Sequence, residues 1–129
     1  METTKVIIPY FENGTFAGVR VTLGDEDFVI APKDYQNGKE MPWQEAMDNL
    51  KADNLATWNY RQICLTMAYR DKIDIVLEDN GGDSLDNFYW TCEEYLPGGT
   101  AYCSGYDGVL YDYNKFRSFS IRPIKNLKK

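Results

Sequence analysis

The residue types that most often carry out enzyme chemistry are scarce in this sequence. The chain contains no histidine, and its three cysteines form no Cys-x-x-Cys pair. A Ser-His-Asp triad, a Cys-His dyad, an imidazole-bound metal and a histidine pH switch are therefore excluded. The cysteine spacing does not favour a structural zinc site. Catalysis would have to rest on carboxylates, tyrosine, lysine or cysteine.

The cysteines Cys64, Cys92 and Cys103 allow two interpretations. An odd number of cysteines gives no closed disulfide framework. Cys92 and Cys103 could form a disulfide if two strands brought them opposite one another, whereas free and mostly buried thiols are the more common state. The sequence favours free thiols and leaves the disulfide open.

Neighbouring carboxylates offer general acid–base catalysis or calcium binding. Glu93 and Glu94 are adjacent, and adjacent residues on a strand point to opposite faces, so these two carboxylates cannot easily converge on one substrate. Several side chains with oxygen atoms that could bind a cation lie at the end of the second helical pattern and after it. Their order differs from that of the ligands in an EF-hand. These side chains are Glu78, Asp79, Asn80, Asp83, Asp86 and Asn87. We expect this 78–87 loop to be solvated, with calcium as the alternative, and we expect no metal site and no enzymatic activity.

Tyrosines give the clearest functional signal. Six of the ten tyrosines lie between residues 89 and 113, several of them in or beside glycine-rich turns. Tyrosine offers a large contact area at low entropy cost, so binding surfaces are rich in it. The candidate ligand-binding residues are Tyr95, Tyr102, Tyr106, Asp107, Tyr111, Tyr113 and Asn114. Strands also favour aromatic residues, so these rings could instead complete the packing of a small hairpin.

Length and charge limit the classes of protein that remain. The 129 residues are close to the usual size of one domain, so residues 1–129 are expected to form a single domain. The formal net charge is −6, and residues 74–114 carry nine acidic side chains and no basic one. The 115–129 tail carries only basic charges and is expected to pair with the acidic middle. Phosphate backbones repel an acidic protein, which argues against a nucleic-acid partner.

Hydropathy predicts neither membrane insertion nor export through a signal peptide. No apolar run approaches the length of a transmembrane helix. Residues 1–5 show no basic start followed by an apolar stretch, so no signal peptide is expected. The expected location is the cytoplasm or a virion, and no cofactor is implied.

Patterned segments then predict the elements that must position these side chains. Lys5–Tyr10 is a short apolar run, Val19–Leu23 alternates with period 2, and Phe28–Ala31 follows a polar turn, which predicts antiparallel strands. A helical stripe follows Pro42, at Trp43, Ala46, Met47 and Leu50. A second stripe comprises Tyr60, Ile63, Cys64, Met67 and Ala68, with a continuation past a break near Asp71 through Ile73, Val76 and Leu77.

The last third predicts short strands separated by glycine-rich turns, at 88–92, 101–104, 109–111 and 118–122. Strands, helices and strands again predict an α+β domain whose termini meet in one sheet. We expect one buried cluster at its centre. Its members are Trp43, Met47, Leu50, Ile63, Met67, Trp90, Phe119 and Ile121.

The order of these motifs resembles a large bacterial and phage family with a C-type-lectin-like fold. Trp43–Ala46 (WQEA) is similar to the W-x-x-A that opens the family's first helix, and Trp58 to the tryptophan before its second. Tyr89–Tyr95 (YWTCEEY) resembles a strand motif YW-S-S-[ST]-E-Y. Asp107-Gly108 resembles a hairpin turn, and Ile121–Ile124 (IRPI) resembles a closing VRPV or VRCV. The family is mostly described as a domain of unknown function and is related in fold to the formylglycine-generating sulfatase-modifying enzymes.

The resemblance covers about residues 17–124, without the family's WRLP before the second helix. It implies two helices packed on a small, twisted, mostly antiparallel sheet, with a second hairpin region near the C-terminus. It also implies a non-catalytic binding or structural module of a bacterial or phage surface or virion assembly, whose partner is a protein or glycan. A decoration domain without a ligand, or an enzyme on the same fold, are the alternatives. Trp43, Trp58, Trp90 and Arg122 would be structural, and Arg122 would need a carboxylate or carbonyl partner.

Overall fold

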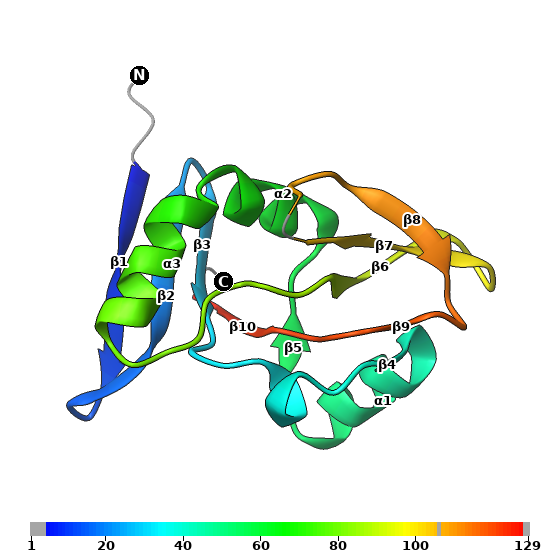
Figure 1. The fold of residues 1–129 in the computed structure, drawn as a ribbon, viewed down its shortest axis with the longest axis horizontal. Helices are drawn as coiled ribbons and strands as arrows, with labels where there is room; N and C mark the ends of the chain where they lie inside the picture. The colour runs from blue at the N-terminus through cyan, green and yellow to red at the C-terminus, as the bar shows by residue number, and fades with distance from the viewer. Residues whose placement is uncertain (1–4, 106, 128–129) are drawn as a thin grey trace.

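The computed structural model describes residues 5–105 and 107–127, which form an α+β fold with antiparallel sheets (Figure 1). This confirms the α+β class expected from the sequence. The largest sheet has the strand order β1-β2-β3-β10-β5. Its strands are β1 (Lys5–Glu12), β2 (Thr15–Leu23), β3 (Glu26–Ile30), β5 (Ala56–Thr57) and β10 (Pro123–Asn126). Because β10 pairs with β3, the two ends of the chain meet in one sheet, as expected.

Three α-helices form where the sequence suggested two stripes. They are α1 (Trp43–Ala52), α2 (Tyr60–Ala68) and α3 (Arg70–Asp79). The second stripe is interrupted at Tyr69, whose φ of −113° and ψ of 22° lie outside the α-helical region. The two-helix expectation is therefore wrong, because this residue ends α2 and redirects the chain into α3, which packs on β1 and β2.

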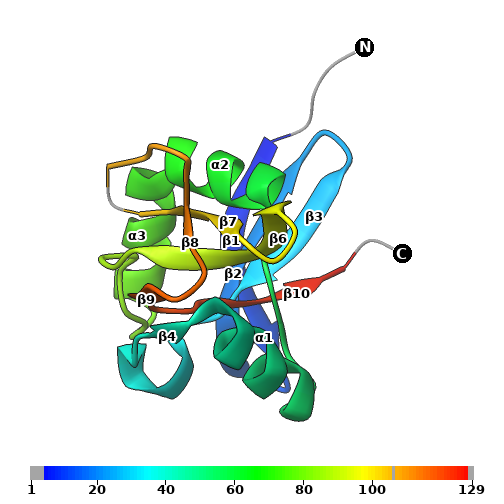
Figure 2. The same ribbon diagram turned by 90° about the vertical axis from the view of Figure 1, so that its right-hand side faces the viewer.

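A second group of strands lies beside the large sheet (Figure 1). The strands β6 (Tyr89–Leu96), β7 (Thr100–Ser104) and β8 (Tyr111–Asn114) form a three-stranded sheet with β7 in the middle. A two-residue ladder joins β4 (Met41–Pro42) to β9 (Ser118–Phe119). Figures 1 and 2 both show α1 and α2 on opposite sides of β6 and β7, so the small sheet has two distinct faces.

The core consists of two clusters, and the expectation of a single cluster is wrong. Ile63 and Met67 of α2 join Trp58 and the inner face of the large sheet in the first cluster. The second cluster contains α1, Trp90 and Ile121, with Met47 and Phe119 packed against it. Each sheet buries its own apolar face against a different helix, which explains the division.

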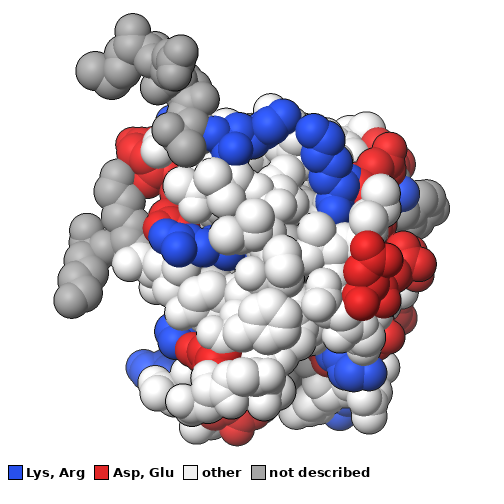
Figure 3. Space-filling view, turned by 90° about the vertical axis from the view of Figure 1, so that its left-hand side faces the viewer, with Lys and Arg blue, Asp and Glu red and all other residues white. Residues whose placement is uncertain are grey.

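The free edge of the large sheet presents a surface poor in charge at its centre (Figure 3). β1 pairs only with β2 and is an edge strand. Ile8 and Phe11 of β1 and Ile75 of α3 are exposed large apolar side chains. Pro9 lies in the middle of this strand, opposite Val19.

Candidate functional site

Buried polar contacts converge on Arg122, which is fully buried. Its guanidinium donates to the carboxylate of Asp34 at 2.9 Å, to the carbonyl of Ala31 at 2.8 Å and to that of Pro32 at 2.8 Å. It also donates to the carbonyl of Asp83. Arg122 thus has both the carboxylate and the carbonyl partners that a buried guanidinium requires.

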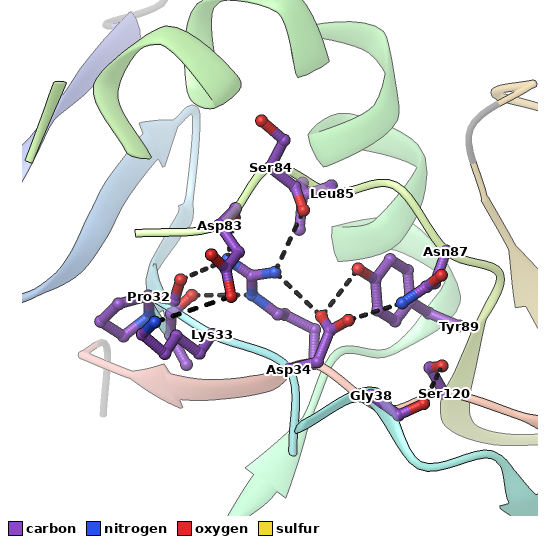
Figure 4. Close-up of polar contacts among 12 residues, drawn as sticks. Pro32, Lys33, Asp34, Gly38, Asp83, Ser84, Leu85, Asn87, Tyr89 and Ser120 are labelled. Carbon is purple, nitrogen blue, oxygen red and sulfur yellow. Dashed lines mark hydrogen bonds and ion pairs between the residues drawn. The ribbon is translucent and has the colours of Figure 1, made fainter. Parts of the chain in front are cut away.

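Asp34 connects this network to β6 (Figure 4). Its carboxylate accepts hydrogen bonds from the Tyr89 hydroxyl and from the Asn87 amide, each at 2.7 Å. Burial, and then the negative charge of Asp34, raise the pKa of Tyr89 well above its usual value. Because the donors and acceptors satisfy one another inside the protein, this network joins the loops after β3 and α3 to β6 and to the residue before β10, and it offers no binding surface.

The tryptophans anchor the helices to the strands. Trp43, at the start of α1, donates from its indole nitrogen to the carbonyl of Thr91 at 2.8 Å. Trp90 donates to the carbonyl of Met41 at 2.9 Å, and its ring contacts that of Phe119 at 4.8 Å. All of these rings except that of Phe119 are buried, as is Trp58 just before α2. Their positions fix α1 on one side of β6 and the start of α2 on the other.

The candidate tyrosines do not share one face of the small sheet. Tyr111 and Tyr113 stack at 5.4 Å and pack against the second core cluster together with Phe88 and Phe119. In the ladder between β7 and β8, Tyr111 lies opposite the buried Cys103. Because side chains alternate along a strand, these two tyrosines point to the side of α1.

Two other candidate residues, Asp107 and Asn114, form hydrogen bonds within the turns before and after β8. Asp107 accepts a hydrogen bond from the Tyr111 hydroxyl at 2.7 Å and another from the amide of Val109. The Tyr111 hydrogen bond is the main reason why the pKa of Asp107 is lowered. Asn114 accepts from the amide of Phe116 at 2.8 Å. Tyr106 lies outside the described residues.

Tyr95 and Tyr102 point to the opposite, outer face, where Tyr60 joins them. The centroid of the Tyr102 ring lies 5.3 Å from that of Tyr60 and 5.4 Å from that of Tyr95. Tyr60 is 45% exposed and Tyr95 is 51% exposed. The hydroxyls of the three rings have no hydrogen-bond partner among the residues that the structure describes.

Sequence reasoning placed Tyr60 on the buried stripe of the second helix, and this is wrong. Tyr60 is the first residue of α2 and lies two residues after the buried Trp58. At this position the side chain is exposed, whereas Ile63 and Met67 further along the helix are buried. Asn59 and Gln62 form a capping box: Asn59 accepts from the Gln62 amide at 2.8 Å, and Gln62 accepts from the Asn59 amide at 2.9 Å. This cap signature was readable in the sequence. The cap holds the Tyr60 ring against Tyr102.

Two carboxylates flank the three rings. Asp112 of β8 lies opposite Tyr102 of β7, and Glu93 of β6 accepts a hydrogen bond from the Tyr60 amide at 3.3 Å. Burial raises the pKa of Tyr102, and the neighbouring Tyr95, Tyr60, Asp112 and Glu93 raise it further. The tyrosine face, as we name it, comprises Tyr60, Glu93, Tyr95, Tyr102 and Asp112.

The three cysteines are free thiols. Cys103 is buried, and burial raises its pKa to about 12. Cys64 and Cys92 are exposed, so the expectation that the thiols are mostly buried is wrong. Cys103 lies opposite Trp90 in the ladder between β6 and β7, and the amide of Cys92 donates to the carbonyl of Trp58 instead. This geometry separates the two cysteines that the sequence allowed to pair.

The acidic loop at 78–87 uses several of its polar groups internally. The Asn80 amide donates to the carbonyl of Val76 at 2.8 Å, and Asn87 donates to Asp34. Within the described part of the chain, no cluster of three or more His, Cys, Asp or Glu residues is arranged to hold a metal ion.

A hollow beside the large sheet offers a second kind of surface. It is lined by Met47 of α1, Leu55 of the following loop, Cys92 of β6 and Asn126 of β10, among others, and has a volume of about 370 Å³. It is open to solvent, and the described residues bring no convergent set of charged groups into it. The tyrosine face is the stronger candidate because its aromatic and acidic groups contact one another.

Comparison of the chain with family models, curated proteins and solved structures finds no match. Among the described residues, no helix has the length and hydrophobicity needed to cross a bilayer.

Proposed function

We propose that this protein is a non-catalytic binding module of a bacterial or phage surface assembly, and that it recognises a protein or glycan partner through the tyrosine face. The observation that carries the proposal is the contact of Tyr60, Tyr95 and Tyr102 on the surface of the small sheet. Two of these rings are about half exposed to solvent. Neighbouring exposed rings form a surface with a large contact area at little cost in side-chain entropy.

The elements beneath the tyrosine face support this proposal. Tyr95 and Tyr102 lie on paired strands, and Tyr60 lies directly after a capped helix start. Binding residues that are held by strands and helices keep their geometry better than residues on loops. The rings therefore need little reorganisation when a partner binds.

Residue chemistry favours binding over catalysis. Glu94 forms an ion pair with Lys115 and accepts a hydrogen bond from the Gly98 amide, which lowers its pKa. A carboxylate held in the ionised form in this way is a poor general acid. The buried Cys103, with a pKa of about 12, is a poor nucleophile.

A C-type-lectin-like organisation remains part of the proposal. It is supported by the pairing of β10 with β3, by the position of the helices between the first and last strands, and by a separate small sheet. In such an arrangement the large sheet is a scaffold, and the small sheet with its hairpins carries recognition.

An array of bacterial surface glycans together with basic, acidic and neutral peptides tests the proposed function. We expect the wild-type protein to bind at least one member, and the Y60S and Y95S variants to lose that binding. Ile75→Ala is the matched control, because Ile75 is 58% exposed and lies on α3. Thermal unfolding verifies that each variant is folded. Absence of binding by the wild type, or equal binding by all variants, would contradict the proposal and favour a decoration domain.

A further inference from the structure

Among the described residues, no cation forms an ion pair with the two carboxylates of the tyrosine face. Within the described residues, the Asp112 carboxylate makes no hydrogen bond or ion pair, and the Glu93 carboxylate accepts only from the Tyr60 amide. Residues 74–114, which contain both, carry no basic side chain. The neighbouring Glu94, in contrast, is paired with Lys115. The tyrosine face is therefore locally negative.

The aromatic rings on the two sides of the small sheet also differ in their cation contacts. On the side of α1, the Arg117 guanidinium lies 4.5 Å from the centre of the Tyr113 ring. The Lys115 ammonium lies 4.4 Å from that of Trp43. Among the described residues, no cation lies over Tyr60, Tyr95 or Tyr102. The outer rings contact one another without a cation and lie beside two carboxylates that have no ion pair among the described residues.

We infer that the tyrosine face binds a basic segment of a partner protein, with an arginine or lysine side chain held against Tyr102 between Glu93 and Asp112. This inference rests on the proposed function and names the chemistry of the partner. Tyr102 lies on the middle strand, and the strands on either side of it supply the two carboxylates. A cation at this position contacts an aromatic ring and a carboxylate together.

The arrangement of the rings favours a cation over a sugar. The Tyr60 and Tyr102 planes are tilted by 33°, and the Tyr95 and Tyr102 planes by 78°. Rings at these angles form no common flat platform on which the face of a sugar ring could stack. A guanidinium or ammonium group needs only one ring face and a nearby carboxylate. The net charge of −6 also increases the rate of encounter with a basic partner.

Two short peptides test the inference by fluorescence anisotropy. One alternates arginine and glycine, and the other replaces each arginine by citrulline, which has a similar shape and no charge. We expect the wild type to bind the arginine peptide, more weakly as salt is raised, and not the citrulline peptide. The E93Q/D112N variant should bind about tenfold more weakly, which corresponds to about 1.4 kcal/mol. The glutamine at position 93 keeps an oxygen that can accept from the Tyr60 amide, so the start of α2 is preserved.

A matched variant separates specific binding from attraction by net charge. E78Q/D79N removes the same charge from exposed positions at the end of α3 and should leave the affinity within about twofold. Equal losses in the two double variants, or equal binding of the citrulline peptide, would overturn the inference. Tyrosine-dependent binding of a glycan, without binding of the arginine peptide, would overturn it and leave the proposed function standing. No binding of any glycan or peptide would overturn both.

Discussion

In the sequence, Arg122 lies between Ile121, which belongs to the second core cluster, and Ile124, which belongs to the first. Its contact with Asp34 joins residues that are 88 positions apart. The need for a polar partner could be predicted from the sequence, because a buried guanidinium without one is costly. The identity of that partner could not, because Asp34 belongs to a loop whose position depends on the whole fold.

At the scale of this residue, replacing Arg122 by methionine should reduce the free energy of unfolding by about 3–5 kcal/mol. The variant removes the guanidinium that pairs with the Asp34 carboxylate and donates to the carbonyl of Ala31. Urea unfolding measures the loss. Arg20→Met is the control, because Arg20 pairs with Asp27 at a partly exposed site and should cost much less. Similar losses in the two variants would contradict a structural role for the buried network.

The tyrosines show most directly what sequence patterns missed. Strand candidates around 102 and 111 were recognised, but the face of each tyrosine depends on the register between β7 and β8. That register sets Tyr102 opposite Asp112 and Tyr111 opposite Cys103. A shift of one residue would exchange the two faces, and no local pattern in the sequence fixes it.

At the scale of elements, local patterns predicted the strands and helices that are amphipathic. The alternation at 19–23 corresponds to β2, and the stripe from Trp43 to Leu50 corresponds to α1. The two-residue strands β4 and β5 have no local pattern, because they exist only through pairing with β9 and β10. The interruption at Tyr69 has no glycine or proline signal, so the pattern places the break near Asp71 and treats the segment beyond it as a continuation of the second stripe rather than as a third helix.

The capping box of α2 gives a prediction for that helix. Asn59→Ala should reduce the free energy of unfolding by about 1 kcal/mol, because the amide of Gln62 loses its acceptor. Asn59→Ser keeps an oxygen acceptor and should remain close to the wild type. Urea unfolding compares the two variants. If alanine and serine have the same effect, the cap does not stabilise the start of α2.

The hairpin of β2 and β3 should give the protein part of its sensitivity to acid. Arg20 and Thr22 donate to Asp27, and the Arg20 hydrogen bond is the main reason why the pKa of this carboxyl is lowered. The ion pair therefore stabilises the fold above the ordinary carboxyl pKa, and this stabilisation is lost as the pH falls through the lowered value.

We expect the free energy of unfolding of the wild type to fall as the pH is lowered below about 4, and to fall less in the Asp27→Asn variant. Asp25→Asn is the control, because Asp25 is an exposed residue of the same turn. Stability curves at several pH values measure the difference. Parallel curves for the wild type and Asp27→Asn would contradict the role of this ion pair.

At the scale of the whole molecule, the proline in the edge strand β1 is expected to hinder self-association through this edge. A proline cannot donate a hydrogen bond, and in sheets it is confined to edges that face solvent or to strand ends. Pro9 should therefore discourage a second chain from pairing with β1. Pro9→Val adds a donor to this edge and should increase the apparent mass at high concentration, measured by light scattering. An unchanged mass would show that the proline does not protect the edge.

The two sheets, each with its own core cluster, have different roles in this account: the large sheet supports the fold, and the small sheet carries the proposed binding face. The large sheet and the Arg122 network hold the termini and loops together. The small sheet presents one face to α1 and the other, with Tyr95 and Tyr102, to the start of α2 and to solvent. Its locally negative charge distinguishes this outer face from the side of the molecule formed by β1 and α3, whose centre is poor in charge (Figure 3).

The location of the binding surface is the central claim, and amide chemical shifts test it most directly. The isotope-labelled protein would be titrated with the probe that binds most tightly on the array. We expect the largest shifts at the amides of Tyr60, Tyr95, Tyr102 and Asp112. Shifts concentrated on β1 and α3, with these amides unchanged, would contradict the account.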